Sequence, residues 1–147
     1  MSRPIEELIF DRTQVDIDNR TLKGEYRAED LNRVETWCEY LKNELNAVGY
    51  SINITTKTDW TMEDMRTMAE MERIRSNIKA IIQGYYTITQ IEPTAENFNF
   101  IKANNWEKIL YEIYWLMFGM ENYYVHSGVA NSGQPRIYQN RFRHLYN

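Results

Sequence analysis

The stretch KTDWTMEDM at residues 57–65 concentrates charged side chains as an active-site loop does. Its lysine, two aspartates and glutamate include both partners of a general acid–base pair. The same spacing fits a helix start, with Thr61 as the N-cap and Asp64 at the third helical position. Met65 then closes a hydrophobic staple over Trp60. We favour the helix start because it explains every polar residue from Thr61 to Asp64.

Side chains that bind metals or act as nucleophiles are few in this sequence. Cys38 is the only cysteine, and neither His126 nor His144 has a cysteine or histidine at ligand spacing. The run DIDNR at residues 16–20 begins like a calcium loop, but Arg20 takes the fifth ligand position and the loop glycine and final glutamate are missing. Cys38 falls on a predicted core face, where a thiol is usually inert. We therefore expect no metal, no cofactor, no small-molecule substrate and no enzymatic activity.

The C-terminal end differs in charge from the rest of the chain. Residues 1–122 hold all 21 acidic residues and 14 of the 17 basic residues, whereas residues 129–147 contain arginines and no acid. Arginine pairs with carboxylates and stacks on rings, and aromatic side chains fill pockets, so this mixture suits a protein interface. Packing within the chain and nucleic-acid binding are the alternatives. The candidate interface residues are Arg136, Tyr138, Arg141, Phe142, Arg143 and Tyr146.

Apolar residues spaced by three and four positions predict long helices at about 29–48, 61–83 and 94–122. Gly49 provides a left-handed stop after the first of them, and Thr94 caps the third. The carboxylates of these helices are expected mostly on solvated faces. The sequence thus predicts a mainly α-helical fold, with the three helices forming an antiparallel bundle.

Shorter features complete the predicted architecture. Thr13, with an aspartate three residues on, predicts a short helix near residues 13–21. The segment 50–60 has β-branched residues and alternating isoleucines, which predicts a loop with extended character. Asn104 and Asn105 interrupt the apolar face of the third helix. Either one of them is buried and hydrogen-bonded across the bundle, or both are exposed.

The chain length and composition set the number of domains. Its 147 residues, 43% of them hydrophobic, suffice for one packed core. We expect a helical bundle domain at 1–128 and an irregular, partly extended arm at 129–147. The longest strongly apolar run, at residues 113–120, is far shorter than the roughly 20 residues that cross a bilayer. With no signal-like N-terminus, these features predict a soluble protein.

Four stretches of the sequence resemble a domain of phage and prophage tail-region proteins of Gram-positive gut bacteria, often labelled minor structural proteins. The stretches are LIFDRTQVDID, LKGEYRAEDLNRVETWCEYL, GYSINITTKTDWT and NNWEKILYEI. The resemblance covers roughly residues 8–128, and its most specific parts are Asp11–Thr13, Asp30–Val34 and Lys57–Thr61. Departures are Phe10, a shorter spacer before Gly24, VHSGVANSG in place of a YSGE ending, and the basic tail.

The resemblance implies a virion component without catalytic residues. Its expected partners are other copies of itself and neighbouring tail proteins, and its expected location is the tail region of a virion assembled in the host cytoplasm. The basic arm lies outside the resemblance, so its role rests on its own composition. A small cytoplasmic helical regulator that binds a host protein or nucleic acid is the alternative function.

Overall fold

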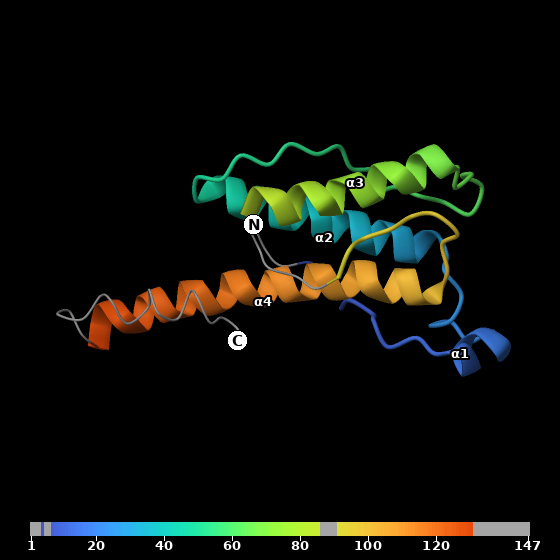
Figure 1. Ribbon diagram of the computed structural model, residues 1–147, viewed down its shortest axis with the longest axis horizontal. Helices are drawn as coiled ribbons and strands as arrows, with labels where there is room; N and C mark the ends of the chain where they lie inside the picture. Colours follow the sequence, from blue (N-terminus) through green and yellow to red (C-terminus); the bar gives the residue numbers. More distant parts are fainter. Residues whose placement is uncertain (1–3, 5–6, 86–90, 131–147) are drawn as a thin grey trace. The chain divides into compact units, whose positions relative to one another are not determined.

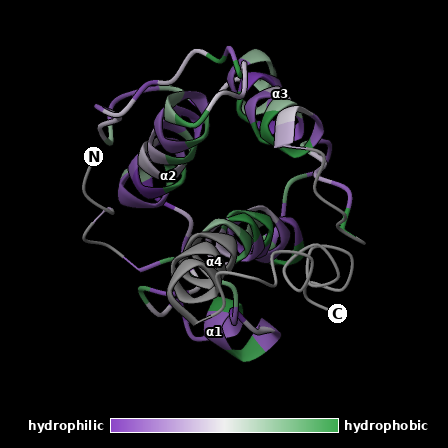
Figure 2. Cartoon of the chain, turned by 90° about the vertical axis from the view of Figure 1, so that its left-hand side faces the viewer, coloured by the Kyte–Doolittle hydropathy of each residue, from purple (hydrophilic) through white to green (hydrophobic). Residues whose placement is uncertain are grey.

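The computed structural model describes residues 4, 7–85 and 91–130, and their side chains as far as Met117 (Figure 1). No strand occurs among these residues, and the predicted mainly α-helical class is confirmed. Figure 2 shows a hydrophobic and a hydrophilic face on both α2 and α3. The helices are α1 at Gln14–Asp18, α2 at Ala28–Ala47, α3 at Met68–Tyr85 and α4 at Phe100–Ala130.

The chain divides into two compact units, residues 1–111 and 112–147. The first holds α1, α2, α3 and the first turns of α4, and the second continues α4. Because α4 runs to Ala130, residues 123–128 and the first two residues of the predicted arm, 129 and 130, are helical. The six candidate interface residues of the arm lie outside the described residues. Over the part of the chain that is described, no helix has the length and apolar composition to cross a membrane.

The core of the first unit follows the predicted periodicity of α2. Leu31, Val34, Cys38, Leu41 and Leu45 are all buried. The pattern ends one turn early, since Val48 is 73% exposed. Gly49 has a φ of 111°, which confirms the predicted left-handed stop. Residues of α3 and α4 complete this core, chiefly Ile74, Ile78, Ile81, Trp106, Ile109 and Leu110.

The direction of α3 corrects the predicted antiparallel packing. Glu35, near the start of α2, bonds Arg73, near the start of α3, at 2.7 Å. Tyr50, just past the end of α2, packs on Tyr85 at the end of α3 with ring centroids 5.1 Å apart. The two helices therefore run in the same direction. The parallel course is possible because the chain after α2 first runs back toward the start of α2 before α3 begins (Figure 1).

That return is made by residues 50–60, which confirm the expected extended character. Ile52 is held by Asn46 and Trp60 by Asn32. Fourteen residues of helix separate the two asparagines, or about 21 Å at 1.5 Å per residue. Eight residues of the returning segment cover that rise at about 2.6 Å each, more than the 1.5 Å per residue of a helix and less than the roughly 3.3–3.6 Å of a fully extended chain. A segment of this length and form allows α3 to begin beside the start of α2.

Two helix starts differ from the predicted positions. Helix α3 begins at Met68 rather than near 61, because the Thr67 hydroxyl accepts the Glu70 amide at 3.2 Å and serves as its cap. Helix α4 begins at Phe100 rather than near 94, because Asn99 accepts the Lys102 amide at 3.0 Å. By contrast, the predicted cap of α1 is confirmed: Thr13 and the aspartate three residues on exchange hydrogen bonds.

Candidate functional site

Arg12, Asp30, Arg33 and Glu107 form a buried ion-pair cluster, called here the first cluster. Each of these residues is 5% exposed or less. Arg12 Nη2 lies 2.8 Å from Glu107 Oε2, and Arg33 Nε lies 2.7 Å from Glu107 Oε1. Arg33 Nη2 lies 2.6 Å from Asp30 Oδ1. Two positive and two negative charges thus compensate one another inside the first unit.

Three separate parts of the chain bring the first cluster together. Arg12 comes from the N-terminal segment, where the amide of Ile9 also donates to Glu107 at 2.8 Å. Asp30 and Arg33 come from the first turns of α2. Asp30 also accepts a hydrogen bond of 2.7 Å from the backbone amide of Arg27, the N-cap residue of that helix. Glu107 comes from α4. The cluster therefore ties the N-terminal segment, α2 and α4 to one another.

The charges in the first cluster are held in place by their partners. Burial alone lowers the pKa of Arg33, but its bonds to Glu107 and Asp30 outweigh burial and keep that pKa above its ordinary value. Burial raises the pKa of the neighbouring Tyr26 hydroxyl well above its ordinary value, and the charge of Glu107 adds to this rise. Arg33 therefore stays positively charged and the Tyr26 hydroxyl stays neutral at neutral pH.

A second cluster surrounds Glu35, which is 0% exposed on α2. Arg73 of α3 binds its carboxylate with both terminal nitrogens, at 2.7 and 2.8 Å. The indole of Trp60 donates to it at 2.6 Å and the backbone amide of Lys57 at 2.9 Å. Because these donors come from α3 and from the returning segment, Glu35 fixes both against α2. Its charge and, above all, burial raise the pKa of the Cys38 thiol, which is fully buried as predicted.

Three asparagines on helices hold extended parts of the chain by the same device. In each case the side-chain carbonyl accepts the backbone amide of one residue, and the side-chain amide donates to the backbone carbonyl of that same residue. A neighbouring strand in a β-sheet likewise pairs with both the N–H and the C=O group of one residue. The six bonds measure 2.7–3.1 Å and join Asn32 to Trp60, Asn46 to Ile52 and Asn104 to Arg12.

The predicted cap and staple of the 57–65 stretch form only in part. The Thr61 amide donates to Asp64 at 2.8 Å and the Asp64 amide to the Thr61 carbonyl at 3.1 Å, but these bonds close an isolated turn ahead of α3. Met65 is 80% exposed, so no staple covers Trp60. Trp60 instead turns inward to Glu35, and this inward contact is the reason that the staple prediction was wrong.

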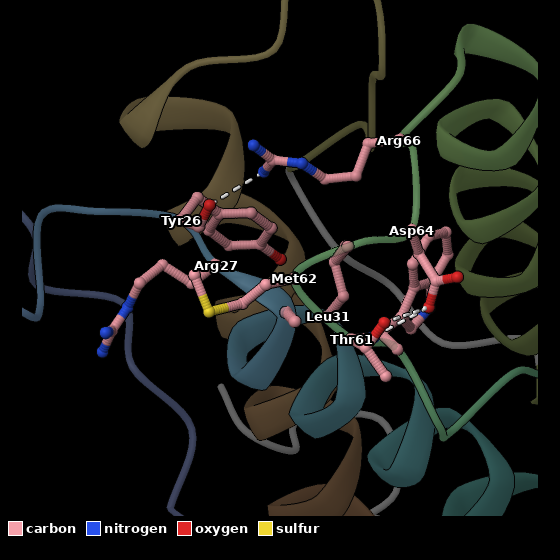
Figure 3. A pocket seen from close by; sticks show the side chains of 9 residues that line it. Tyr26, Arg27, Leu31, Thr61, Met62, Asp64 and Arg66 are labelled. Atoms are coloured by element: carbon pink, nitrogen blue, oxygen red, sulfur yellow. Dashed lines mark hydrogen bonds between the residues drawn. The ribbon is translucent and has the colours of Figure 1, made fainter.

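A pocket of about 240 Å³ lies beside this turn (Figure 3). Tyr26, Leu31 and Trp60 line it together with Met62, which is 91% exposed. The Arg66 guanidinium reaches across to the Tyr26 carbonyl oxygen at 2.8 Å, as the dashed line in Figure 3 shows. The pocket therefore combines an aromatic and aliphatic lining with charged groups at its edge.

The buried charges were not expected from the sequence, which predicts carboxylates mostly on solvated faces. Glu35 and Glu107 instead lie in the core. A usable signal was their position beside core residues, since Glu35 follows Val34 and Glu107 follows Trp106. No group of three potential metal ligands is present where side chains are described. In place of a calcium loop, Asp16 serves as the capping partner of α1.

Comparison with protein families, curated proteins and solved structures finds no match for this chain. All four stretches of the sequence resemblance contribute to the two clusters. They supply Arg12, Asp30, Arg33 and Glu107 to the first cluster and Glu35, Lys57 and Trp60 to the second.

Proposed function

We propose that the chain is a non-enzymatic structural component of a phage or prophage tail or baseplate. It assembles through contacts with copies of itself and with neighbouring tail proteins, in the host cytoplasm, and it resides in the tail region of the virion. The class of particle comes from the sequence resemblance. The structural role is supported by what the buried charged residues do.

The observation that carries the structural role is the saturation of Glu35 and Glu107. Each carboxylate accepts four hydrogen bonds, two on each oxygen, and each residue is 0% exposed. An ionised carboxylate has about four acceptor sites, so none remains for a substrate proton. A general base must reach the proton that it removes. These two carboxylates are therefore suited to cross-linking the fold.

Such a framework fits a part that is built repeatedly into one assembly. The two clusters lock the N-terminal segment, the returning segment and α3 onto α2. A rigid subunit presents the same surfaces in every copy, and symmetric assemblies depend on repeated identical contacts. The basic and aromatic composition of residues 129–147 adds a segment suited to such contacts.

Interrupting the gene tests this function directly. A stop codon early in the gene, in the phage or induced prophage that carries it, is expected to yield particles with absent or incomplete tails in electron micrographs. Supplying the intact chain from a plasmid should restore the tails. Normal tails and full infectivity without the chain contradict the proposal. A silent codon change at the same position serves as the control.

A further inference from the structure

Residues 59–65, DWTMEDM, form a surface segment called here the acidic methionine loop. It carries Asp59, Glu63 and Asp64 and no basic residue. Its two methionines are 91% exposed at Met62 and 80% exposed at Met65. Exposed flexible methionines are typical of surfaces that bind partners, because the thioether adapts its shape and packs well on aromatic rings.

The adjacent pocket has the size of a site for one side chain. Its volume is about 240 Å³, whereas small-molecule sites typically measure about 300–1,000 Å³. Tyr26, Leu31 and Trp60 give it an aromatic and aliphatic lining. Arg66 at its edge offers a planar guanidinium, which stacks on rings. An aromatic side chain is therefore the occupant that this lining favours.

The charges around the loop favour basic residues beside that aromatic side chain. Lys57 Nζ lies 2.9 Å from Asp59 and 3.6 Å from Asp64, and compensates part of their charge. Arg27 and Arg66 line the pocket itself, so basic residues of an occupant are expected to pair with the loop carboxylates and not with the pocket edge. Glu63 is exposed and has no ion-pair partner within the described residues. The segment of this chain that matches is RFR at 141–143, in which arginines stand on both sides of an aromatic ring.

We propose that residues 129–147 of one copy dock on the acidic methionine loop of a second copy. Phe142 fills the pocket, and Arg141 and Arg143 pair with carboxylates of the loop. This inference rests on the proposed function, which requires contacts between copies. The inference names the surface that binds the basic segment. The contact is then head-to-tail, because each copy binds the segment of one neighbour and docks its own segment on another.

Cross-linking between two full-length variants tests the contact. One variant carries Met62→Cys beside the pocket, and the other, made distinguishable by a mass tag, carries Leu145→Cys close to Phe142. The native Cys38 is 0% exposed and does not compete. We expect a mixed disulfide dimer under mild oxidation. The control is Val48→Cys, which is 73% exposed at the opposite end of α2, about 30 Å away for a 20-residue helix.

Docking predicts several-fold more mixed dimer with Met62→Cys than with Val48→Cys. Adding Phe142→Ala to the Leu145→Cys chain, or Glu63→Lys to the Met62→Cys chain, should reduce the yield to the control level. Salt should reduce it too, because exposed ion pairs are screened. Circular dichroism confirms that each variant is folded.

Equal yields for Met62→Cys and Val48→Cys overturn the inference. So does a disulfide that forms only within one chain carrying both Met62→Cys and Leu145→Cys, since the segment then folds back on its own copy. Neither result bears on the proposed function, which is decided by the tails of particles made without the chain. The two proposals therefore fail separately.

Discussion

The Arg12 guanidinium and the Glu107 carboxylate are 95 residues apart in sequence and 2.8 Å apart in space, and both side chains are 0% exposed. This pair joins the N-terminal segment to α4. Burying two charges costs several kcal/mol per ion, which their attraction and further hydrogen bonds must offset. Here Arg33 and the Ile9 amide supply those further bonds. The pair thus belongs to a network in which each charge is hydrogen-bonded. Removing one of its charged groups leaves the others buried without a partner, which destabilises the fold.

Glu107→Gln should destabilise the fold strongly. The substitution leaves the charges of Arg12 and Arg33 inside the protein with Asp30 as their remaining anion. Removing one partner of a buried ion pair typically costs about 3–5 kcal/mol. Urea unfolding followed by circular dichroism measures this loss. Glu63→Gln, on the surface, should stay within about 0.5 kcal/mol of the unchanged chain, and similar losses for the two variants would show that the first cluster does not stabilise the fold.

Asn104→Ala and Asn105→Ala form a matched pair on neighbouring residues. Asn104 bonds the amide and the carbonyl of Arg12 at 3.1 and 3.0 Å. Its removal leaves two backbone groups without these partners, at a cost of about 1–3 kcal/mol each where they are buried. We therefore expect faster hydrogen exchange at the Arg12 amide in Asn104→Ala only. The same exchange rate in both variants would rule out the carboxamide bridge.

Thr67→Ala should weaken α3 more than Thr61→Ala does. The Thr67 hydroxyl caps the helix by accepting the Glu70 amide, and losing such a cap typically costs about 1 kcal/mol. Thr61 closes an exposed turn that precedes the helix, so its loss should stay within about 0.5 kcal/mol. Urea midpoints of the two variants decide between them. A larger loss of stability in Thr61→Ala than in Thr67→Ala would indicate that α3 begins near residue 61, as expected from the sequence.

The stability of the protein should fall as the solution becomes acidic. Hydrogen bonds from Thr13, Thr61 and Thr56 hold the pKa values of Asp16, Asp64 and Glu39 below their ordinary values of 3.8, 3.8 and 4.5. A carboxyl group with a lowered folded-state pKa stabilises the fold above its unfolded pKa, and this contribution disappears as the pH falls through the folded value. Urea unfolding between pH 6 and pH 2 measures the effect.

Thr56→Val provides the specific check on this pH dependence. The Thr56 hydroxyl donates to Glu39 at 2.8 Å, and valine keeps the shape but removes the donor. The pKa of Glu39, followed by NMR titration of its side chain, should rise toward its ordinary value while that of Asp16 stays unchanged. An unaltered Glu39 titration would mean that the hydroxyl does not lower this pKa.

The sequence predicted those features that depend on neighbours within one or two helical turns. The spacing of Leu31, Val34 and Cys38 placed the core face of α2, because a helix repeats every 3.6 residues. Capping by Thr13 and the left-handed Gly49 were likewise local. The same local rule misplaced α3, because Thr-x-x-acid occurs twice before it, at Thr61 and at Thr67, and only the second begins the helix.

Features that depend on distant partners were not predictable. From the sequence, Glu35 and Glu107 look like ordinary solvated helix carboxylates. Their arginine partners, Arg73 and Arg12, are 38 and 95 residues away, so no local pattern indicates the pairing. The parallel course of α2 and α3 also escaped prediction, because it follows from side chains that hold the returning segment. Asn104 illustrates the same limit: of the two neighbouring asparagines, only the fold selects the one that bonds Arg12.

The proposed virion role requires that the chain be part of the purified particle. Mass spectrometry of particles purified through a density gradient tests it most directly. We expect peptides of this chain in the purified particles, at a fixed copy number relative to the major tail protein, and resistant to washing with salt. Abundant chain in the host lysate but none in washed, infectious particles would contradict the account.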